Sequence, residues 1–299
     1  MAAPDGLLVV DKDPGWTSHD VVGRVRRLAA TRKVGHAGTL DPMATGVLVV
    51  GIGRATRLLG HLALTTKAYD ATIRLGQSTV TDDADSDVVD QHDAGGLSAE
   101  AIEAAVVNLR GDIAQVPSAV SAVKINGERA YRRVRAGEDV VLPARPVRVS
   151  SFTIDGSQRH GSVVDLNVHI ECSTGTYVRA LARDLGRALG VGGHLTRLRR
   201  TRVGCYDTHQ AATLQELAEL PPQSLPVIGL DRAAVDNFAS YVLAAGDVAA
   251  VRNGRVLCAE LTPDRTDQPV ALLTPSGEFL ALYEQQGALA KAVAVFAPD

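Results

Sequence analysis

Apolar and polar positions alternate in two segments of the chain, and each segment predicts a β-strand. Every second residue between 164 and 170 is apolar, which is the period of a strand with one buried face. Residues 69–75 alternate in the same way, which puts Tyr69 on the apolar side of its strand. Both segments therefore belong to a sheet that is covered on at least one face.

Helical spacing appears in three other segments. Thr17 and Asp20 have the spacing of a capping box, and apolar residues follow at Val21, Val22, Val25 and Leu28. A second helix is predicted from Ser98 to Gly111, and a third from Thr176 to Gly190. The third helix carries three arginines on one face, namely Arg179, Arg183 and Arg187. Strands and helices without a regular β-α-β rhythm predict an α+β fold.

A Pro-rich stretch at residues 220–226 predicts a linker, with a domain boundary near residue 228. Beyond it, residues 229–299 hold five basic and nine acidic residues, a shift toward negative charge. Short apolar runs predict strands around Val251 and over residues 270–273, 279–283 and 292–296. This pattern fits a small C-terminal β-barrel.

Charge is distributed unevenly over the 299 residues, although the net charge is only −3. Residues 21–34 contain five basic side chains and no acidic one. Residues 195–203 add four arginines, Arg197, Arg199, Arg200 and Arg202. Such local clusters are compatible with a nucleic-acid partner even when the whole chain is slightly acidic.

The sequence also sets expectations about the compartment. We find no secretory signal and no apolar run of the roughly 18 residues that a membrane span needs. The three cysteines are far apart and form no Cys-x-x-Cys pair, so neither disulfides nor a zinc site are expected. We therefore expect a cytoplasmic protein that does not enter a membrane.

The segment GHAGTLDPMATG, residues 35–46, carries the most distinctive chemistry. Its three glycines allow backbone conformations closed to bulkier residues, and Pro42 disfavours helical geometry at Asp41. The expected result is a rigid loop that presents a carboxylate beside His36. An isolated Asp-Pro pair is usually a structural turn, but twelve residues in this arrangement favour a functional loop.

Four segments together resemble the tRNA pseudouridine synthase B (TruB) family, which converts the T-loop uridine at tRNA position 55 to pseudouridine. They are KVGHAGTLDPMATGVLVVGIGRATRL at 33–58, KAYDA at 67–71, STGTYVRALARDLG at 173–186 and HLTRLRRTRVG at 194–204. The resemblance extends over nearly the whole chain and is weaker beyond the linker. One departure is Lys12-Asp13-Pro14-Gly15, where the family usually has Lys-Pro-x-Gly.

The resemblance implies a role for particular residues. Asp41 falls on the catalytic carboxylate, Tyr69 on the residue that stacks on the target uracil, and Arg179 on the partner of the carboxylate. We expect Arg179 to lower the pKa of Asp41. Substrate-binding positions fall on His36, Tyr177 and Leu198, and RNA-phosphate contacts on Arg197, Arg199, Arg200 and Arg202.

The resemblance also implies an architecture. A pseudouridine synthase domain at residues 1–228 is expected to contain a mixed, largely antiparallel sheet flanked by helices. Residues 121–148 are expected to form a mobile loop that clamps the RNA, and residues 229–299 a PUA-like β-barrel domain.

The implied reaction moves the ribose bond of uracil from N1 to C5 after the base is flipped out of the T loop. Because all atoms are conserved, no cofactor and no metal is expected. The expected partner is the T stem-loop of tRNA, bound by a monomer. Whether the carboxylate attacks the base, attacks ribose C1′ or removes a ribose proton stays open.

Two other classes of function remain at this point. A non-catalytic RNA-binding module would need the basic clusters but not Asp41. A nucleotide-dependent oxidoreductase is suggested by Gly-Ile-Gly-Arg-Ala at residues 51–55, which follows an apolar run. That fragment lacks the third glycine of the dinucleotide fingerprint and the later acidic residue, so it is the weaker alternative.

Overall fold

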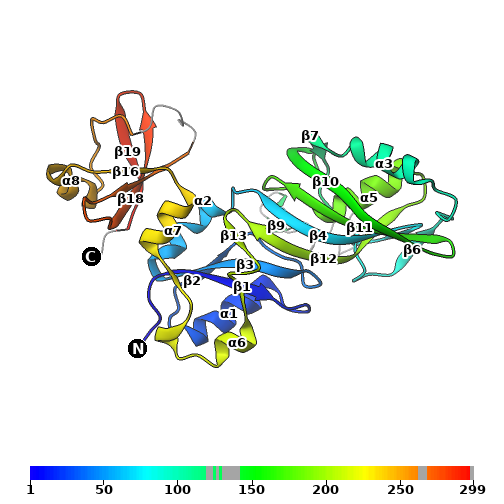
Figure 1. Cartoon of the computed structure of the whole chain (residues 1–299), viewed down its shortest axis with the longest axis horizontal. Helices are drawn as coiled ribbons and strands as arrows, with labels where there is room; N and C mark the ends of the chain where they lie inside the picture. Colours follow the sequence, from blue (N-terminus) through cyan, green and yellow to red (C-terminus); the bar gives the residue numbers. More distant parts are fainter. Residues whose placement is uncertain (119–123, 126–127, 130–141, 262–267, 297–299) are drawn as a thin grey trace.

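The computed structural model describes residues 1–118, 124–125, 128–129, 142–261 and 268–296, and within them two main sheets dominate (Figure 1). Eight strands of the larger sheet form a continuous path, in the order β14 (Ala212–Thr213), β1 (Gly6–Lys12), β3 (Thr45–Ile52), β12 (Gly193–Val203), β4 (Lys67–Leu75), β11 (Val163–Cys172), β10 (Arg145–His160) and β7 (Gly111–Gln115). Three further strands pair at its sides, β2 (Val34–Ala37) with β3, β13 (Tyr206–Asp207) with β12 and β15 (Ile228–Gly229) with β1. Among the described strands of this sheet, the β1–β14 and β3–β12 pairs are parallel and the other pairs are antiparallel. The predicted mixed and largely antiparallel sheet is confirmed.

Helices flank this sheet in two groups. The helices α1 (Ser18–Leu28) and α6 (Leu214–Ala218) lie together beside β1 and β2, whereas α3 (Ala99–Val107) and α5 (Val178–Ala188) lie beside β10–β12 (Figure 1). One continuous apolar core extends under both groups of helices. It includes Val10 of β1, Val25 of α1, Ile73 of β4 and Leu181 of α5. The remaining short elements are η1 (Gly53–Arg57), α2 (Leu59–Leu62), β5 (Gln77–Thr79), β6 (Val88–Gln91), η2 (Pro222–Ser224) and α7 (Leu230–Asn237).

The helix starts follow from local chemistry. At α1 the Thr17 hydroxyl accepts from the Asp20 amide at 3.1 Å, and the Asp20 carboxylate accepts from the Thr17 amide at 3.0 Å. The predicted capping box is therefore present. Ser98 caps α3 as predicted, but the helix ends at Val107, because the chain turns there. Gly111, with a positive φ of 82°, is the first residue of β7. The third predicted helix begins at Val178, two residues later than expected.

The two parts of the large sheet meet where β3 runs parallel to β12, a contact that we call the seam. Only two residue pairs are in register there, Thr45 with Arg199 and Gly46 with Arg200. Gly46 has a φ of 98°, and a Cβ at this position would lie 2.1 Å from the Arg200 carbonyl oxygen. Glycine is therefore required by both the backbone conformation and the close approach of the strands.

We expect Gly46→Ala to weaken the fold measurably. The methyl group would collide with the backbone of β12, which cannot move without disturbing the seam, so the free energy of unfolding should fall by about 3 kcal/mol or more. Urea unfolding followed by circular dichroism measures the change. Gly23→Ala is the matched control, because a Cβ at this helical position meets nothing within 4 Å. An equal effect of both substitutions would contradict the steric argument.

Beyond α7, the described residues form a small sheet with the order β16 (Ser240–Val242), β17 (Val270–Leu273), β18 (Phe279–Gln286) and β19 (Leu289–Val295), together with η3 (Ala245–Asp247) and α8 (Val248–Arg252). The three predicted strands after residue 269 are confirmed. The strand predicted around Val251 is wrong, since this residue lies in α8, where its side chain is fully buried. A short apolar run does not distinguish a strand from a short helix. Among the described residues, the sheet is an open path and no closed barrel is seen.

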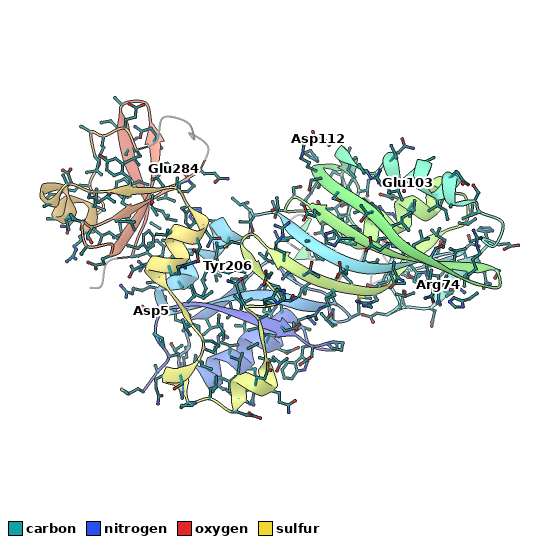
Figure 2. The ribbon with its side chains drawn as sticks, in the orientation of Figure 1. Asp5, Arg74, Glu103, Asp112, Tyr206 and Glu284 are labelled. Atoms are coloured by element: carbon teal, nitrogen blue, oxygen red, sulfur yellow. The ribbon has the colours of Figure 1, made fainter. Side chains whose placement is uncertain are left out.

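The small sheet is attached to the large one by polar and apolar contacts. Arg54 and Arg57, which follow β3, donate to the carbonyl oxygens of Phe296 and Val295. One apolar cluster contains residues of β1 and β3 together with Phe279 and Phe296. Tyr206, labelled in Figure 2, is buried beside α7, and its hydroxyl accepts a hydrogen bond of 2.7 Å from Asn237. The large sheet ends at Gly229 and the small sheet begins at Ser240, on either side of α7.

Two remaining expectations are the clamping loop and the absence of a membrane span. Most of the predicted clamping loop, residues 121–148, lies outside the described residues; within it, β8 (Lys124–Ile125) pairs with β9 (Glu128–Arg129). In the part of the chain that is described, no helix has the length and apolar character needed to cross a membrane.

Candidate active site

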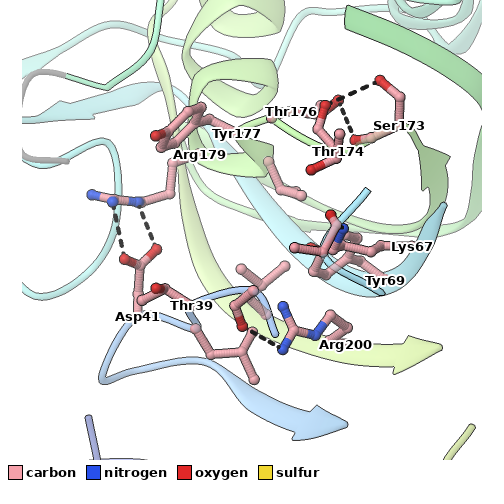
Figure 3. Close-up of a pocket in the computed structure, with 16 residues that line it drawn as sticks. Thr39, Asp41, Lys67, Tyr69, Ser173, Thr174, Thr176, Tyr177, Arg179 and Arg200 are labelled. Atoms are coloured by element: carbon pink, nitrogen blue, oxygen red, sulfur yellow. Dashed lines mark hydrogen bonds and ion pairs between the residues drawn. The ribbon is translucent and has the colours of Figure 1, made fainter. Parts of the chain in front are cut away.

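A pocket of about 270 Å³ opens where the 38–41 loop, β4, β12 and the start of α5 converge (Figure 3). Five of the six residues predicted to act in catalysis or substrate binding line it, although they come from four separate segments. They are Asp41, Tyr69, Tyr177, Arg179 and Leu198. The volume is slightly below the usual range for drug-sized ligands, so the pocket suits a small group such as a single ring.

Asp41 and Arg179 face each other at one wall of this pocket and form a two-pronged ion pair (Figure 3). Arg179 Nε lies 3.0 Å from Asp41 Oδ2, and Nη2 donates to Oδ1 at 3.1 Å. The Arg179 side chain is 5% exposed, whereas that of Asp41 is 35% exposed. The guanidinium therefore fixes the plane of a carboxylate that an incoming molecule can still reach.

Arg179 is itself held from behind. Its Nη1 donates to the Thr81 carbonyl oxygen at 2.9 Å and lies 3.3 Å from Oδ2 of Asp83, a carboxylate that is 4% exposed. Asp83 also accepts from the amide of Asp85 at 3.1 Å. One arginine thus connects an accessible carboxylate to a buried one.

The ionisation of Asp41 differs from the sequence-based expectation. Burial raises the pKa of Asp41 above its ordinary value, Arg179 counteracts this in part, and the negative charge of Asp83 adds to the rise. Arg179 lowers the pKa as predicted, but burial outweighs this effect, so the pKa of Asp41 stays above its ordinary value.

Tyr69 and Leu198 form the apolar part of the pocket. Tyr69 on β4 is 7% exposed and Leu198 on β12 is 5% exposed. These two strands are paired, with Leu198 opposite Ala71 and Arg200 opposite Tyr69. Burial raises the pKa of the Tyr69 phenol, so the ring is uncharged. A flat aromatic face beside a leucine is suited to holding a nucleobase.

Tyr177 lies at the start of α5 and lines the pocket. Its amide donates to the Gln115 side-chain oxygen at 2.8 Å, and the Gln115 amide group donates back to the Tyr177 carbonyl at 3.1 Å. This reciprocal pair links the end of β7 to the helix start, which fixes the position of Arg179 two residues later.

His36 is not among the residues that line the pocket. It lies in β2, where its ring meets that of His19 edge to face with centroids 5.6 Å apart. Burial lowers the pKa of His36, and its buried Nδ1 has no hydrogen-bond partner among the described residues. The substrate-binding role predicted for His36 would therefore require contact with RNA beside the pocket.

The four arginines of β12 do not form one phosphate-facing surface. Arg199 pairs with Asp11 at 2.6 Å and Arg202 with Glu171 at 2.7 Å, whereas Arg197 is exposed. Arg200 is 1% exposed and lines the pocket, so we correct the prediction that it contacts phosphate. Side chains alternate along a strand, which sends neighbouring arginines to opposite faces.

On α5 the three arginines of the predicted shared face differ in their burial and in their partners. Arg179 is buried, Arg183 pairs with Asp82 at 3.2 Å, and Arg187 is exposed. Exposure therefore increases along the helix, away from the pocket.

Three residues near the pocket were missed by the sequence analysis. Asp83 lies in an acidic run, which is usually a solvated surface. Lys12 is fully buried and its ammonium donates to the Pro42 carbonyl at 3.2 Å, next to Asp41. Lys67 lines the pocket, and its place two residues before Tyr69 on the same strand face was the signal that would have found it.

Over the described residues, no group of three or more His, Cys, Asp or Glu side chains could hold a metal ion.

Family models match nearly the whole chain. Residues 26–178 match the TruB family pseudouridylate synthase N-terminal domain, residues 179–223 the tRNA pseudouridylate synthase B C-terminal domain, and residues 238–297 the C-terminal region of tRNA pseudouridine synthase II. The fold and these matches define a pseudouridine synthase, which is an isomerase. Within that class, the chain belongs to the TruB family.

Relatives of similar length support this assignment. The tRNA pseudouridine synthase B of Mycolicibacterium paratuberculosis is 56% identical and covers 99% of both chains. That of Arthrobacter is 55% identical over 98% of this chain and 97% of the relative. Among solved structures, a Cbf5-Nop10-Gar1 complex contains a chain that is 26% identical, with a TM-score of 0.74 over 98% of this chain and 85% of its own length.

Proposed function

We propose that this enzyme converts uridine 55 in the T loop of tRNA to pseudouridine, with Asp41 as the catalytic carboxylate. The observation that carries the proposal is the Asp41–Arg179 ion pair at the wall of a pocket that also presents Tyr69. The near-full-length relatives named tRNA pseudouridine synthase B support tRNA as the substrate. The assignment to position 55 in the T loop rests on the motif resemblance.

In the proposed reaction, the target uridine leaves the RNA stack and its base enters the pocket. The ring of Tyr69 stacks on the uracil, with Leu198 and Tyr177 completing the contact surface. Arg179 holds the ionised carboxylate of Asp41 toward the nucleotide. The C1′–N1 bond then breaks, the base turns, C5 bonds to C1′, and the proton on C5 is lost while N1 gains one.

Incubation with an unmodified tRNA transcript, followed by mapping of pseudouridine, tests the function directly. We expect one pseudouridine, in the T loop at position 55. Product at a different tRNA position would contradict the site assignment while leaving the enzyme class intact. Binding without any product would instead favour the non-catalytic RNA-binding module.

Tyr69→Phe should separate stacking from any role of the hydroxyl. The ring is kept, so tRNA affinity should stay within about threefold of the wild type, because the stacking energy of roughly 1–3 kcal/mol per base is retained. Tyr69→Ala, the matched comparison, should weaken base capture by that amount. Fluorescence binding and single-turnover rates measure both. Equal affinity losses in the two variants would argue against stacking. A slow Phe variant with normal binding would assign the hydroxyl to a later step, such as proton loss from C5.

The raised pKa of Asp41 predicts an acid limit to activity. Because the reaction requires the ionised carboxylate, the single-turnover rate should fall as the pH drops through this pKa. The midpoint should lie above the ordinary Asp value of about 3.9. Single-turnover rates from pH 4 to 8, with tRNA binding measured at each pH, test this. A rate that stays constant down to pH 4 would contradict it.

Several further features belong to the same proposal. Residues 1–228 would form the catalytic domain, with residues 121–148 as an RNA clamp, and residues 229–299 a PUA-like domain. Arg197, Arg199 and Arg202 would contact RNA phosphates, and His36 would stack within the T loop beside the pocket. We propose a monomer that acts in the cytoplasm without a cofactor or metal.

A further inference from the structure

Two buried cations lie in the pocket across from the Asp41–Arg179 pair. Lys67 on β4 is 6% exposed and Arg200 on β12 is 1% exposed, and both line the pocket. Figure 3 shows them beside Tyr69, away from the ion pair. Lys67 is two residues before Tyr69, and Arg200 is in register with Tyr69 on the neighbouring strand. All three side chains therefore belong to one face of the sheet.

Neither cation has a carboxylate within 4.0 Å among the described residues. The Lys67 ammonium donates to the carbonyl oxygens of Ala63 and Thr65, each at 3.0 Å. Arg200 donates to the carbonyl oxygens of Val47 at 2.7 Å and Gly38 at 3.0 Å. Their positive charges are thus solvated by backbone dipoles but not neutralised.

This arrangement is costly for the free protein. A buried charge without a counter-ion loses several kcal/mol of hydration energy that backbone carbonyls replace only in part. The arginines near Arg200 on β12 differ from it, because Arg199 and Arg202 both have carboxylate partners. Of the four arginines of β12, the buried one without a carboxylate partner is therefore the one that lines the pocket.

The two cations also lie close together. Lys67 Cε and Arg200 Nη1 are each 3.4 Å from the point that a Cβ on Gly38 would occupy, so these atoms are separated by at most twice that distance. Burial and, to a smaller extent, the positive charge of Arg200 lower the pKa of Lys67 to about 8. The ammonium is still mostly protonated at pH 7, and a negative charge placed between the two cations would relieve their repulsion.

We propose that Lys67 and Arg200 stabilise the negative charge that the uracil carries while it is detached from the ribose. The inference rests on the proposed function of this pocket. When the C1′–N1 bond breaks heterolytically, its electron pair stays on the base and spreads over N1 and the carbonyl oxygens. An electron pair at C5 then forms the new bond to C1′, C5 loses its proton, and N1 takes one up.

The pocket is complementary to this charge separation. With the base stacked on Tyr69, the ribose would lie toward Asp41, which provides negative charge where the sugar becomes electron-poor when the bond breaks. Lys67 and Arg200 provide positive charge beside Tyr69, where the base is proposed to lie. Fixed charges that match the transition state lower the barrier without reorganisation, and each such group is commonly worth 10²–10³-fold in rate.

The test compares Lys67→Gln with Lys67→Arg. Glutamine keeps a donor for the Ala63 and Thr65 carbonyls but removes the charge, whereas arginine keeps both. We expect Lys67→Gln to lower the single-turnover rate by about 10²-fold, with tRNA affinity almost unchanged and with thermal stability equal to or above that of the wild type, because a buried charge is removed. Lys67→Arg should recover most of the rate. Lys291→Gln removes the same charge from an exposed position on β19 and should have no effect.

A second measurement uses tRNA with 5-fluorouridine at the target position. The fluorinated base is a better leaving group, and its C5 carries no proton to lose, so the rate of C1′–N1 bond cleavage is compared for both bases. This cleavage should depend less on Lys67 in the fluorinated substrate, and the deficit of Lys67→Gln should shrink. The proposal is overturned if Lys67→Gln keeps the wild-type rate, if Lys67→Arg is equally slow, if affinity falls in parallel with rate, or if the deficit is the same for both bases. Each of these results leaves the proposed function intact as long as the wild type forms pseudouridine and Asp41→Asn does not.

Discussion

Replacement of Asp41 by Asn is expected to abolish turnover, with a loss of about 10⁴-fold or more in the single-turnover rate. Asparagine has the shape of the carboxylate but cannot act as a nucleophile or base. It keeps one oxygen that can accept from Arg179, and Arg179 retains Asp83 on its other side. The fold and the affinity for tRNA should therefore be preserved.

The matched control is Asp87→Asn, which removes the same charge from an exposed acidic residue and should leave the rate unchanged. Rates are measured with enzyme in excess over tRNA, so that product release does not contribute. If Asp41→Asn retains more than a tenth of the wild-type rate, Asp41 is not the catalytic carboxylate. If it loses tRNA binding instead, its role is in recognition.

Arg179→Lys is expected to have the second-largest effect on the chemical step. Lysine keeps the positive charge but cannot contact both oxygens of Asp41 and also reach Thr81 and Asp83. A carboxylate displaced by about 1 Å commonly costs 10²-fold in rate, which is the loss we expect. The dependence of tRNA binding on salt should change little, because Arg179 is buried.

Arg197→Ala provides the contrast, since Arg197 is exposed on β12. If it contacts a phosphate, its loss should reduce the salt slope of binding by about one unit without slowing the chemical step. Single-turnover rates and binding at several salt concentrations distinguish the two patterns. A reduced salt slope with a normal rate in Arg179→Lys would place Arg179 among the phosphate-binding residues.

Local patterns predicted much of the fold. The capping box at Thr17, the Ser98 cap and the alternating strands over 69–75 and 164–170 all depend on neighbours in sequence. The motifs also identified five residues with predicted catalytic or substrate-binding roles that line one pocket. The residue roles themselves stay predictions until the variants are made.

Features that depend on burial were not predictable in the same way. The pKa of Asp41 is set by how much water reaches the pocket, which the sequence does not contain. Arg200 looks identical to its neighbours in a run of basic residues, and only strand alternation and pairing with β4 bury it. The run around Val251 is too short for its period to distinguish a helix from a strand.

The seam between β3 and β12 has a kinetic consequence. Asp41 precedes β3, whereas Tyr69 and Arg179 belong to segments on the other side, and the ion pair joins residues 138 positions apart. The helices and the β10–β11 pair need only contacts between residues that are near in sequence, whereas the site requires β12 to pair with both β3 and β4, and these distant pairings have the larger loop-closure cost. During refolding, circular dichroism should therefore recover before catalytic turnover does.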